Sequence, residues 1–112
     1  MPFKDLSEVE QNIIYQCLKA TVEGSFFPEW EFNTLFGLTR QEVKQIIKDW
    51  AVIDRDSSIV ILAINNSFNN LLYYPHKCER EWHNFISVSR QKLKTIYSKW
   101  KGTEQGYFSN MM

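Results

Sequence analysis

Three residues in the second half of the chain have the side chains that most resemble a metal site: His76, Cys78 and His83. Structural zinc sites use pairs of Cys or His ligands that are usually separated by at least two residues. A single residue separates His76 from Cys78, and the sequence contains no second cysteine pair. The other cysteine, Cys17, falls on an apolar helical stripe and is expected in the core. The sequence therefore predicts neither a metal site nor a cofactor.

The carboxylates that most resemble a general acid–base pair are Glu29 and Glu31. Side chains two positions apart on a helix diverge by about 200°, so these two do not share a site. Acidic residues are common in the first turn of a helix, where they complement the helix dipole. Phosphate-binding loops, GxSxG and HExxH motifs do not occur in the sequence. We therefore expect no enzymatic activity.

An unusual run of amides, Asn65-Asn66-Ser67-Phe68-Asn69-Asn70, precedes two tyrosines and Pro75. Each Asn in a helix costs roughly 0.5 kcal/mol relative to Ala, so four within six positions indicate that they bind something. One interpretation is a docking face for a protein partner, since amides and tyrosines bind without desolvating a charge. The other is that the amides cap neighbouring helices or bridge the two halves of the chain. The residues assigned to the docking face are Asn65, Asn66, Asn69, Asn70, Tyr73, Tyr74 and His76, of which Asn65, Asn66, Asn69 and Tyr73 are expected to be exposed.

Charge is unevenly distributed although the formal net charge is zero. Residues 1–31 carry a net charge of −4, whereas residues 76–101 carry +5. A basic helix over Arg90–Lys101 is typical of the reading helix of a small nucleic-acid-binding domain. Such domains usually have a basic excess overall, which this chain lacks. A helical DNA- or RNA-binding regulator is therefore the second hypothesis, after a protein-binding module.

The elements that carry these residues repeat along the chain. Residues 29–50 align with residues 79–100 at an offset of 50 positions, and a period of this size is typical of a unit made twice. The pattern predicts an all-α bundle of about six helices, built from two three-helix units at about 7–50 and 57–100. The identical pairs are Glu29/Glu79, Glu31/Glu81, Arg40/Arg90, Gln41/Gln91, Lys44/Lys94, Ile46/Ile96 and Trp50/Trp100.

Local signals place the helix boundaries. Ser7 and Thr39 each begin a capping box, and Ser89 occupies the equivalent position before the last helix. Gly24 is expected to end the first helix in the left-handed conformation. A short helix should begin near Pro28 and end near residues 36–37. Trp50 and Trp100 end equivalent apolar stripes and are expected to be buried where the two units meet.

The segment from Ile59 to Tyr74 is ambiguous, because its first four residues are continuous and mostly β-branched, as in a strand. Apolar residues at helical spacing and Pro75 at its end favour a helix. At 112 residues the chain is one domain, for which we expect a helical body over residues 1–101 and a flexible tail over 102–112. No apolar run approaches the roughly 20 residues of a membrane span, and the N-terminus does not resemble a signal peptide. A cytoplasmic location with no membrane partner is therefore expected.

Several short segments carry a resemblance to a known family: 30–32, 35–39, Ala63-Ile64-Asn65-Asn66, Tyr74-Pro75-His76 and Glu81-Trp82. They resemble small helical bacterial immunity proteins, which are encoded beside toxins of contact-dependent or polymorphic systems. The resemblance covers about residues 26–100. It implies a protein-binding inhibitor that blocks a toxin, often a nuclease-type domain, rather than an enzyme. Immunity proteins against nucleases are often acidic, so in this neutral chain any mimicry of nucleic acid would come from the N-terminal third.

Overall fold

The computed structural model describes residues 3–103, and within this range the chain is helical and contains no strand. The predicted all-α fold of about six helices is confirmed, and the ambiguous segment 59–74 lies in a helix. Two short 3-10 segments, η1 (Phe3–Asp5) and η2 (Glu79–Glu81), accompany the α-helices. The α-helices are α1 (Glu8–Glu23), α2 (Glu29–Phe36), α3 (Arg40–Lys48), α4 (Ser58–Tyr73), α5 (Trp82–Phe85) and α6 (Arg90–Thr103).

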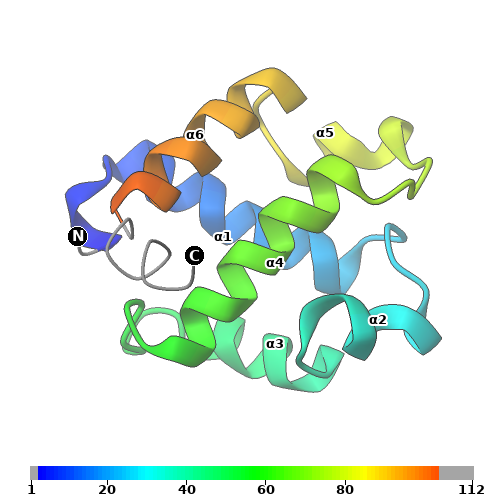
Figure 1. Ribbon diagram of the computed structural model, residues 1–112, viewed down its shortest axis with the longest axis horizontal. Helices are drawn as coiled ribbons and strands as arrows, with labels where there is room; N and C mark the ends of the chain where they lie inside the picture. Colours follow the sequence, from blue (N-terminus) through cyan, green and yellow to red (C-terminus); the bar gives the residue numbers. More distant parts are fainter. Residues whose placement is uncertain (1–2, 104–112) are drawn as a thin grey trace.

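The two long helices, α1 and α4, pack against each other at the centre of the molecule. The helices α3 and α5 pack on α1, whereas α6 and α2 pack on α4. In Figure 1, α4 crosses the middle of the view, with α6 on one side and α2 and α3 on the other. Each long helix is thus covered by the last helix of its own half and by a short helix of the other half. The two halves therefore share one core, whose largest fully buried side chains include Trp100, Phe26, Phe32, Phe36 and Phe68.

Several helix boundaries of the two halves correspond at the offset of 50 residues. The helices α1 and α4 are both 16 residues long and begin at Glu8 and Ser58. The helices α3 and α6 begin at Arg40 and Arg90. The rings of Phe26 and His76, at equivalent positions, meet edge to face with centroids 4.9 Å apart.

The predicted helix starts are confirmed at Ser7 and Thr39, where both bonds of each capping box are present. The Oγ of Ser89 accepts a hydrogen bond from the backbone N–H of Lys92. The prediction for Gly24 is wrong, because its backbone is extended (φ −84°, ψ 174°) rather than left-handed. Glycine is needed there for space, since a Cβ would lie 2.7 Å from the Phe26 ring and 2.8 Å from the Ala20 carbonyl. Gly37, after α2, is the glycine in the left-handed conformation (φ 69°).

The expected burial is confirmed for Trp100, whose ring lies beside those of Phe68 and Tyr97 in the same half of the chain. Trp50 instead lies beyond the end of α3 and is half-buried. Its ring packs against those of Phe3 and Tyr15, each at a centroid distance of 5.6 Å. The N-terminal η1 segment therefore covers Trp50, in a contact that has no equivalent in the repeat pattern.

The last helix extends past the predicted domain end at residue 101 and includes residues 102 and 103. The predicted tail begins at residue 102, and its residues 104–112 lie outside the part that the structure describes. Among the described helices, none has the length and apolar character needed to cross a membrane.

Candidate functional site

Two of the four amides bind the end of α2. Asn66 donates from Nδ2 to the carbonyl of Phe36 at 2.8 Å, and Asn70 donates to the carbonyl of Leu35 at 3.0 Å. These carbonyls belong to the last turn of α2, where backbone acceptors have no partner within the helix. Asn70 is buried and Asn66 is half-buried. These two amides therefore cap α2 and join the two halves of the chain, which is the second interpretation given above.

A third amide, Asn65, joins α4 to α6. Its Oδ1 accepts a hydrogen bond of 2.8 Å from the hydroxyl of Tyr97, and its Nδ2 donates to Oδ1 of Asn66 at 3.3 Å. Burial raises the pKa of Tyr97, so this hydroxyl stays a donor. Asn65 and Asn66 are half-buried, so the expectation that they are exposed is wrong. Their angular position on α4 is as predicted, but neighbouring helices reach them.

Tyr74 and His76 also make internal contacts. The hydroxyl of Tyr74 donates to the carboxylate of Glu31, and this hydrogen bond raises the pKa of Tyr74. Nε2 of His76 donates to the carbonyl of Leu71 at 3.0 Å, and its Nδ1 accepts from the backbone N–H of Cys78. Because a carbonyl can only accept, the Nε2–H tautomer satisfies both bonds. Both side chains therefore fix the segment that follows α4.

The outer face of α4 carries the side chains that remain exposed. Residues spaced by three or four positions share one side of a helix, and Ile59, Leu62, Asn66, Asn69 and Tyr73 follow this spacing. Ile59, Leu62 and Tyr73 are 43%, 40% and 60% exposed, and Asn69 is exposed as well. We call these five residues the α4 outer face. Of the seven residues predicted for docking, it retains Asn69 and Tyr73 as exposed groups.

Ile59 and Leu62 were not among the residues that the sequence assigned to the candidate docking face. Their spacing to Asn66, Asn69 and Tyr73 was a signal that could have identified them. On the same face, the Nζ of Lys94 in α6 lies 5.8 Å from the centre of the Tyr73 ring. The face is therefore apolar and amide-rich, with a positive charge at the tyrosine end.

The corresponding face of α1 has a different chemistry. The equivalent positions, 50 residues earlier, are Val9, Asn12, Gln16, Lys19 and Glu23, which we call the α1 outer face. Lys19 and Glu23 form an ion pair of 3.8 Å, and Oε1 of Gln16 accepts from the backbone N–H of Ser87. Gln16 thus binds the segment after α5, much as Asn66 binds the end of α2. Each outer face therefore contains one amide that binds a neighbouring segment. At the last two positions, α1 has the charged pair Lys19 and Glu23, whereas α4 has Asn69 and Tyr73.

Arg40, at the start of α3, donates hydrogen bonds within the protein from all three of its guanidinium nitrogens. Its guanidinium carbon lies 4.5 Å from the centre of the Phe32 ring, and its Nε donates to Glu29 at 2.5 Å. The Arg40 side chain is only 17% exposed. Its two Nη atoms donate to the backbone carbonyls of Thr21, Val22 and Phe27.

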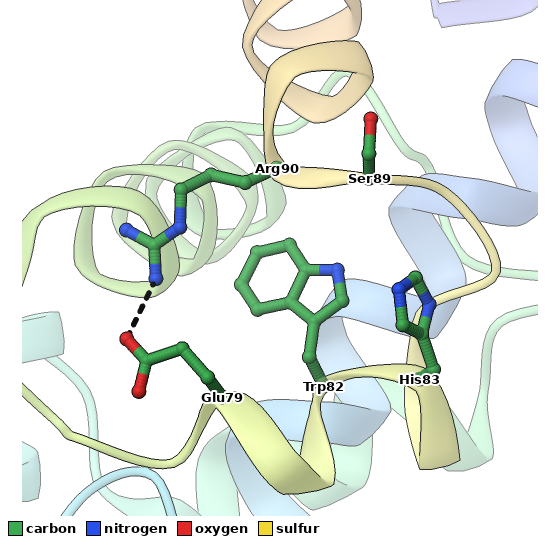
Figure 2. A pocket seen from close by; sticks show the side chains of 5 residues that line it. All are labelled: Glu79, Trp82, His83, Ser89 and Arg90. Atoms are coloured by element: carbon green, nitrogen blue, oxygen red, sulfur yellow. Dashed lines mark hydrogen bonds and ion pairs between the residues drawn. The ribbon is translucent and has the colours of Figure 1, made fainter.

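Arg90, the equivalent residue of α6, has fewer contacts and borders a cavity of about 210 Å³. Its guanidinium carbon lies 5.3 Å from the Trp82 ring, and Nη1 donates to the Leu72 carbonyl at 2.7 Å. The contact between Nη2 of Arg90 and the Glu79 carboxylate is long, at 3.4 Å, and the Arg90 side chain is 38% exposed. Figure 2 shows the indole of Trp82 between Arg90 and Glu79 on one side and His83 and Ser89 on the other. These five residues line the cavity.

The residues considered in the sequence as metal ligands or nucleophiles include His76 and Cys78, which contact each other in the segment after α4. Within residues 3–103, no three His, Cys, Asp or Glu side chains are grouped so that they could hold a metal ion. Cys17 is buried, and burial raises the pKa of its thiol. Burial also raises the pKa of Cys78, whose thiol contacts the carbonyl of Ser25. Neither cysteine therefore has the lowered pKa of a nucleophilic thiol.

No protein-family model matches the chain, and the comparisons with curated proteins and with solved structures found no match either.

Proposed function

We propose that the chain is a protein-binding module whose partner docks on the α4 outer face. The observation that supports this proposal is the contrast between the outer faces of α1 and α4. The α1 outer face ends in a charged pair, Lys19 and Glu23, whereas α4 has Asn69 and Tyr73 at the same positions. Leu62 replaces the polar Asn12 in the same way. A partner would bury the exposed parts of these large side chains.

This contrast rests on our inference that the two halves are copies of one three-helix unit. Three contacts of Arg40 recur at Arg90: the stacking on an aromatic ring, the bond to a carboxylate and the bond to a backbone carbonyl. The partners in each contact are also 50 residues apart. Copies of one unit start with the same surface, so their present differences mark positions where the roles of the two surfaces differ.

As to the kind of partner, we propose a toxin that the chain inhibits by direct binding, in the manner of an immunity protein in the cytoplasm. The support for this narrower proposal is the resemblance carried by the segments between residues 26 and 100. Occluding an active site requires a rigid surface and no catalytic group. The hydrogen bonds of Asn66 and Asn70 to α2 hold the α4 outer face in place, so little conformational entropy is lost on binding.

Binding to nucleic acid through α6 is less well supported, because most of the basic side chains of this helix have internal contacts. Lys99 bonds both carboxylate oxygens of Glu10 at 3.0 Å. Lys94 and Lys101 lie over the rings of Tyr73 and Tyr97. Contacts with phosphates would compete with these interactions, since reading helices use free Lys and Arg side chains.

The test compares two double variants at equivalent positions. Asn69→Ala/Tyr73→Ala removes the exposed groups of the α4 outer face, and Lys19→Ala/Glu23→Ala is the matched control on α1. The measurements are the calorimetric affinity for the protein encoded by the adjacent reading frame and the protection of growing cells from that protein.

We expect the α4 variant to lose about 2 kcal/mol or more of binding free energy, as for central interface residues. The α1 variant should bind like the wild type. Because Asn69 and Tyr73 are uncharged, the loss should change little with salt concentration. Equal losses in the two variants would contradict the α4 site, and a wild-type chain that neither binds nor protects would contradict the proposed inhibition.

A further inference from the structure

We propose that the cavity beside Arg90 binds a carboxylate that is attached to an apolar group. Arg90 would pair with the carboxylate, and the Trp82 indole would contact the apolar group. This cavity shares no residue with the α4 outer face, so the proposal is independent of the proposed function.

Arg90 makes fewer hydrogen bonds than its equivalent, Arg40. All three nitrogens of the Arg40 guanidinium donate to protein acceptors. At Arg90, Nη1 makes one bond of 2.7 Å and Nη2 makes one of 3.4 Å. Among the described residues, Nε of Arg90 has no hydrogen-bond partner. A guanidinium has five N–H donors in a planar fork, so Arg90 retains donors for a second planar group.

The difference has a local structural cause in the segment between α4 and η2. In the first half, the carbonyls of Thr21 and Phe27 both accept from Arg40. In the second half, the equivalent carbonyl of Leu71 accepts from His76 instead. Lys77, equivalent to Phe27, has a positive φ of 59°. The backbone path of the second half therefore leaves Arg90 with fewer acceptors and more exposure.

A carboxylate, that of Glu79, already contacts Arg90, and this contact is weak. Glu79 lies 3.4 Å from Nη2, and its side chain is 69% exposed. Its equivalent, Glu29, lies 2.5 Å from Nε of Arg40. A long, exposed ion pair contributes little to stability, so an incoming carboxylate can replace Glu79 at small cost.

The wall of the cavity combines the cationic Arg90 with the aromatic ring of Trp82. The cavity of about 210 Å³ has room for a ring or a short aliphatic group, and Trp82, which is 5% exposed, lies between the other lining residues (Figure 2). The indole N–H of Trp82 is bonded to the Val88 carbonyl at 2.8 Å, which holds the ring in place. The wall therefore offers a fixed aromatic surface next to a cation, which favours an organic acid over a small inorganic anion.

Titration of the full chain with organic acids, followed by NMR, tests the proposal. The probes are benzoate for a free aromatic acid and acetyl-phenylalanine for the C-terminus of a peptide, at constant ionic strength. Benzamide and acetyl-phenylalanine amide are the uncharged controls. The reporters are the side-chain N–H signals of Arg90 and Trp82.

We expect saturable shifts of both reporters with the acids and none with the amides. Glu79→Gln should tighten binding roughly two- to fivefold, which is the strength of the exposed pair that it removes. Glu29→Gln, the matched control, should leave the affinity for the acids unchanged. Arg90→Lys should weaken binding, because an ammonium lacks the planar fork. The stronger of the two acids would indicate whether a free acid or a peptide terminus is the natural ligand.

Three results would overturn the proposal. One is the absence of saturable shifts in both the wild type and Glu79→Gln, which does not depend on whether Arg90→Lys folds. Another is equal binding of the acids and their amides. The last is an equal gain in affinity for the acids in Glu79→Gln and Glu29→Gln. Such a gain would be an effect of the changed net charge and not of this cavity.

Discussion

At the scale of single residues, the amides of α4 divide into an internal and an external group. Asn66 and Asn70 bond the last turn of α2, and Asn65 bonds Tyr97. Asn69 is exposed. Removing a buried donor leaves its acceptor without a partner, and this costs more than an average hydrogen bond contributes. Neighbouring amides should therefore respond to the same substitution in opposite directions.

The first prediction compares Asn70→Ala with Asn69→Ala. Asn70→Ala should lower the free energy of unfolding by about 1–3 kcal/mol, because the Leu35 carbonyl loses its donor. Asn69→Ala should be neutral or stabilise by up to roughly 0.5 kcal/mol, because Ala is the better helix former. Urea denaturation of both variants measures the difference. Coincident midpoints would show that the Asn70 bond does not contribute.

The sequence identified these amides as unusual but could not divide them. Their spacing along α4 follows from local periodicity, and it placed Asn65 and Asn66 on the same side as Asn69 and Tyr73. Whether an amide on that side is exposed depends on which helices lie beside it. The end of α2 and the hydroxyl of Tyr97 come from other parts of the chain, and no local pattern encodes their position.

At the scale of helices, boundaries set by local hydrogen bonds were predictable and those set by tertiary packing were not. The capping boxes at Ser7 and Thr39 involve only residues within one turn, and both are present. Gly24 was expected to adopt a positive φ, but its role is to make room for the Phe26 ring and the Ala20 carbonyl. A glycine at the end of a helix can thus serve either to adopt a positive φ or to make room for a neighbouring group. The local sequence does not show which of the two applies.

The second prediction concerns this close approach. Gly24→Ala should destabilise the fold by about 1–3 kcal/mol, as expected for overpacking. Gly102→Ala is the matched control, since a Cβ at Gly102 meets nothing within 4 Å in the last turn of α6. That change should be neutral or stabilising, because Gly is a poor helix former. Thermal unfolding of both variants measures the effect, and a Gly24→Ala variant as stable as the wild type would contradict it.

The third prediction concerns the link between α1 and α6. The backbone N–H of Ser7 and the ammonium of Lys99 both lower the pKa of Glu10 below its ordinary value of 4.5. A carboxyl with a lowered pKa in the folded state stabilises the fold above its unfolded pKa, and this contribution is lost as the pH falls through the folded pKa. Glu10→Gln should therefore lower stability by roughly 0.2–1 kcal/mol near neutral pH.

Denaturant titrations of the wild type and Glu10→Gln over a range of pH values measure this dependence. The difference between them should shrink as the pH falls below 4.5, the ordinary pKa of the carboxyl. A difference that does not change with pH would mean that the charge of Glu10 has no part in joining α1 to α6.

At the scale of the whole molecule, the all-α fold and the number of helices followed from the internal similarity of the sequence. Each long helix packs against a short helix of the other half. An alignment of one half with the other does not predict these contacts between the halves. Trp50 illustrates this limit, since its aligned partner Trp100 is buried while Trp50 packs under the N-terminal segment. Likewise, the alignment shows that Arg40 and Arg90 correspond but not that their hydrogen bonding differs.

The central claim is that the α4 outer face, and not the equivalent face of α1 or the basic side of α6, contacts the partner. NMR shift mapping of the labelled chain with the protein from the adjacent reading frame tests it directly. We predict that the largest changes fall at Ile59, Leu62, Asn69 and Tyr73, and that the residues of the α1 outer face change little. Changes concentrated on the α1 outer face, or on the lysines of α6 alone, would contradict the claim.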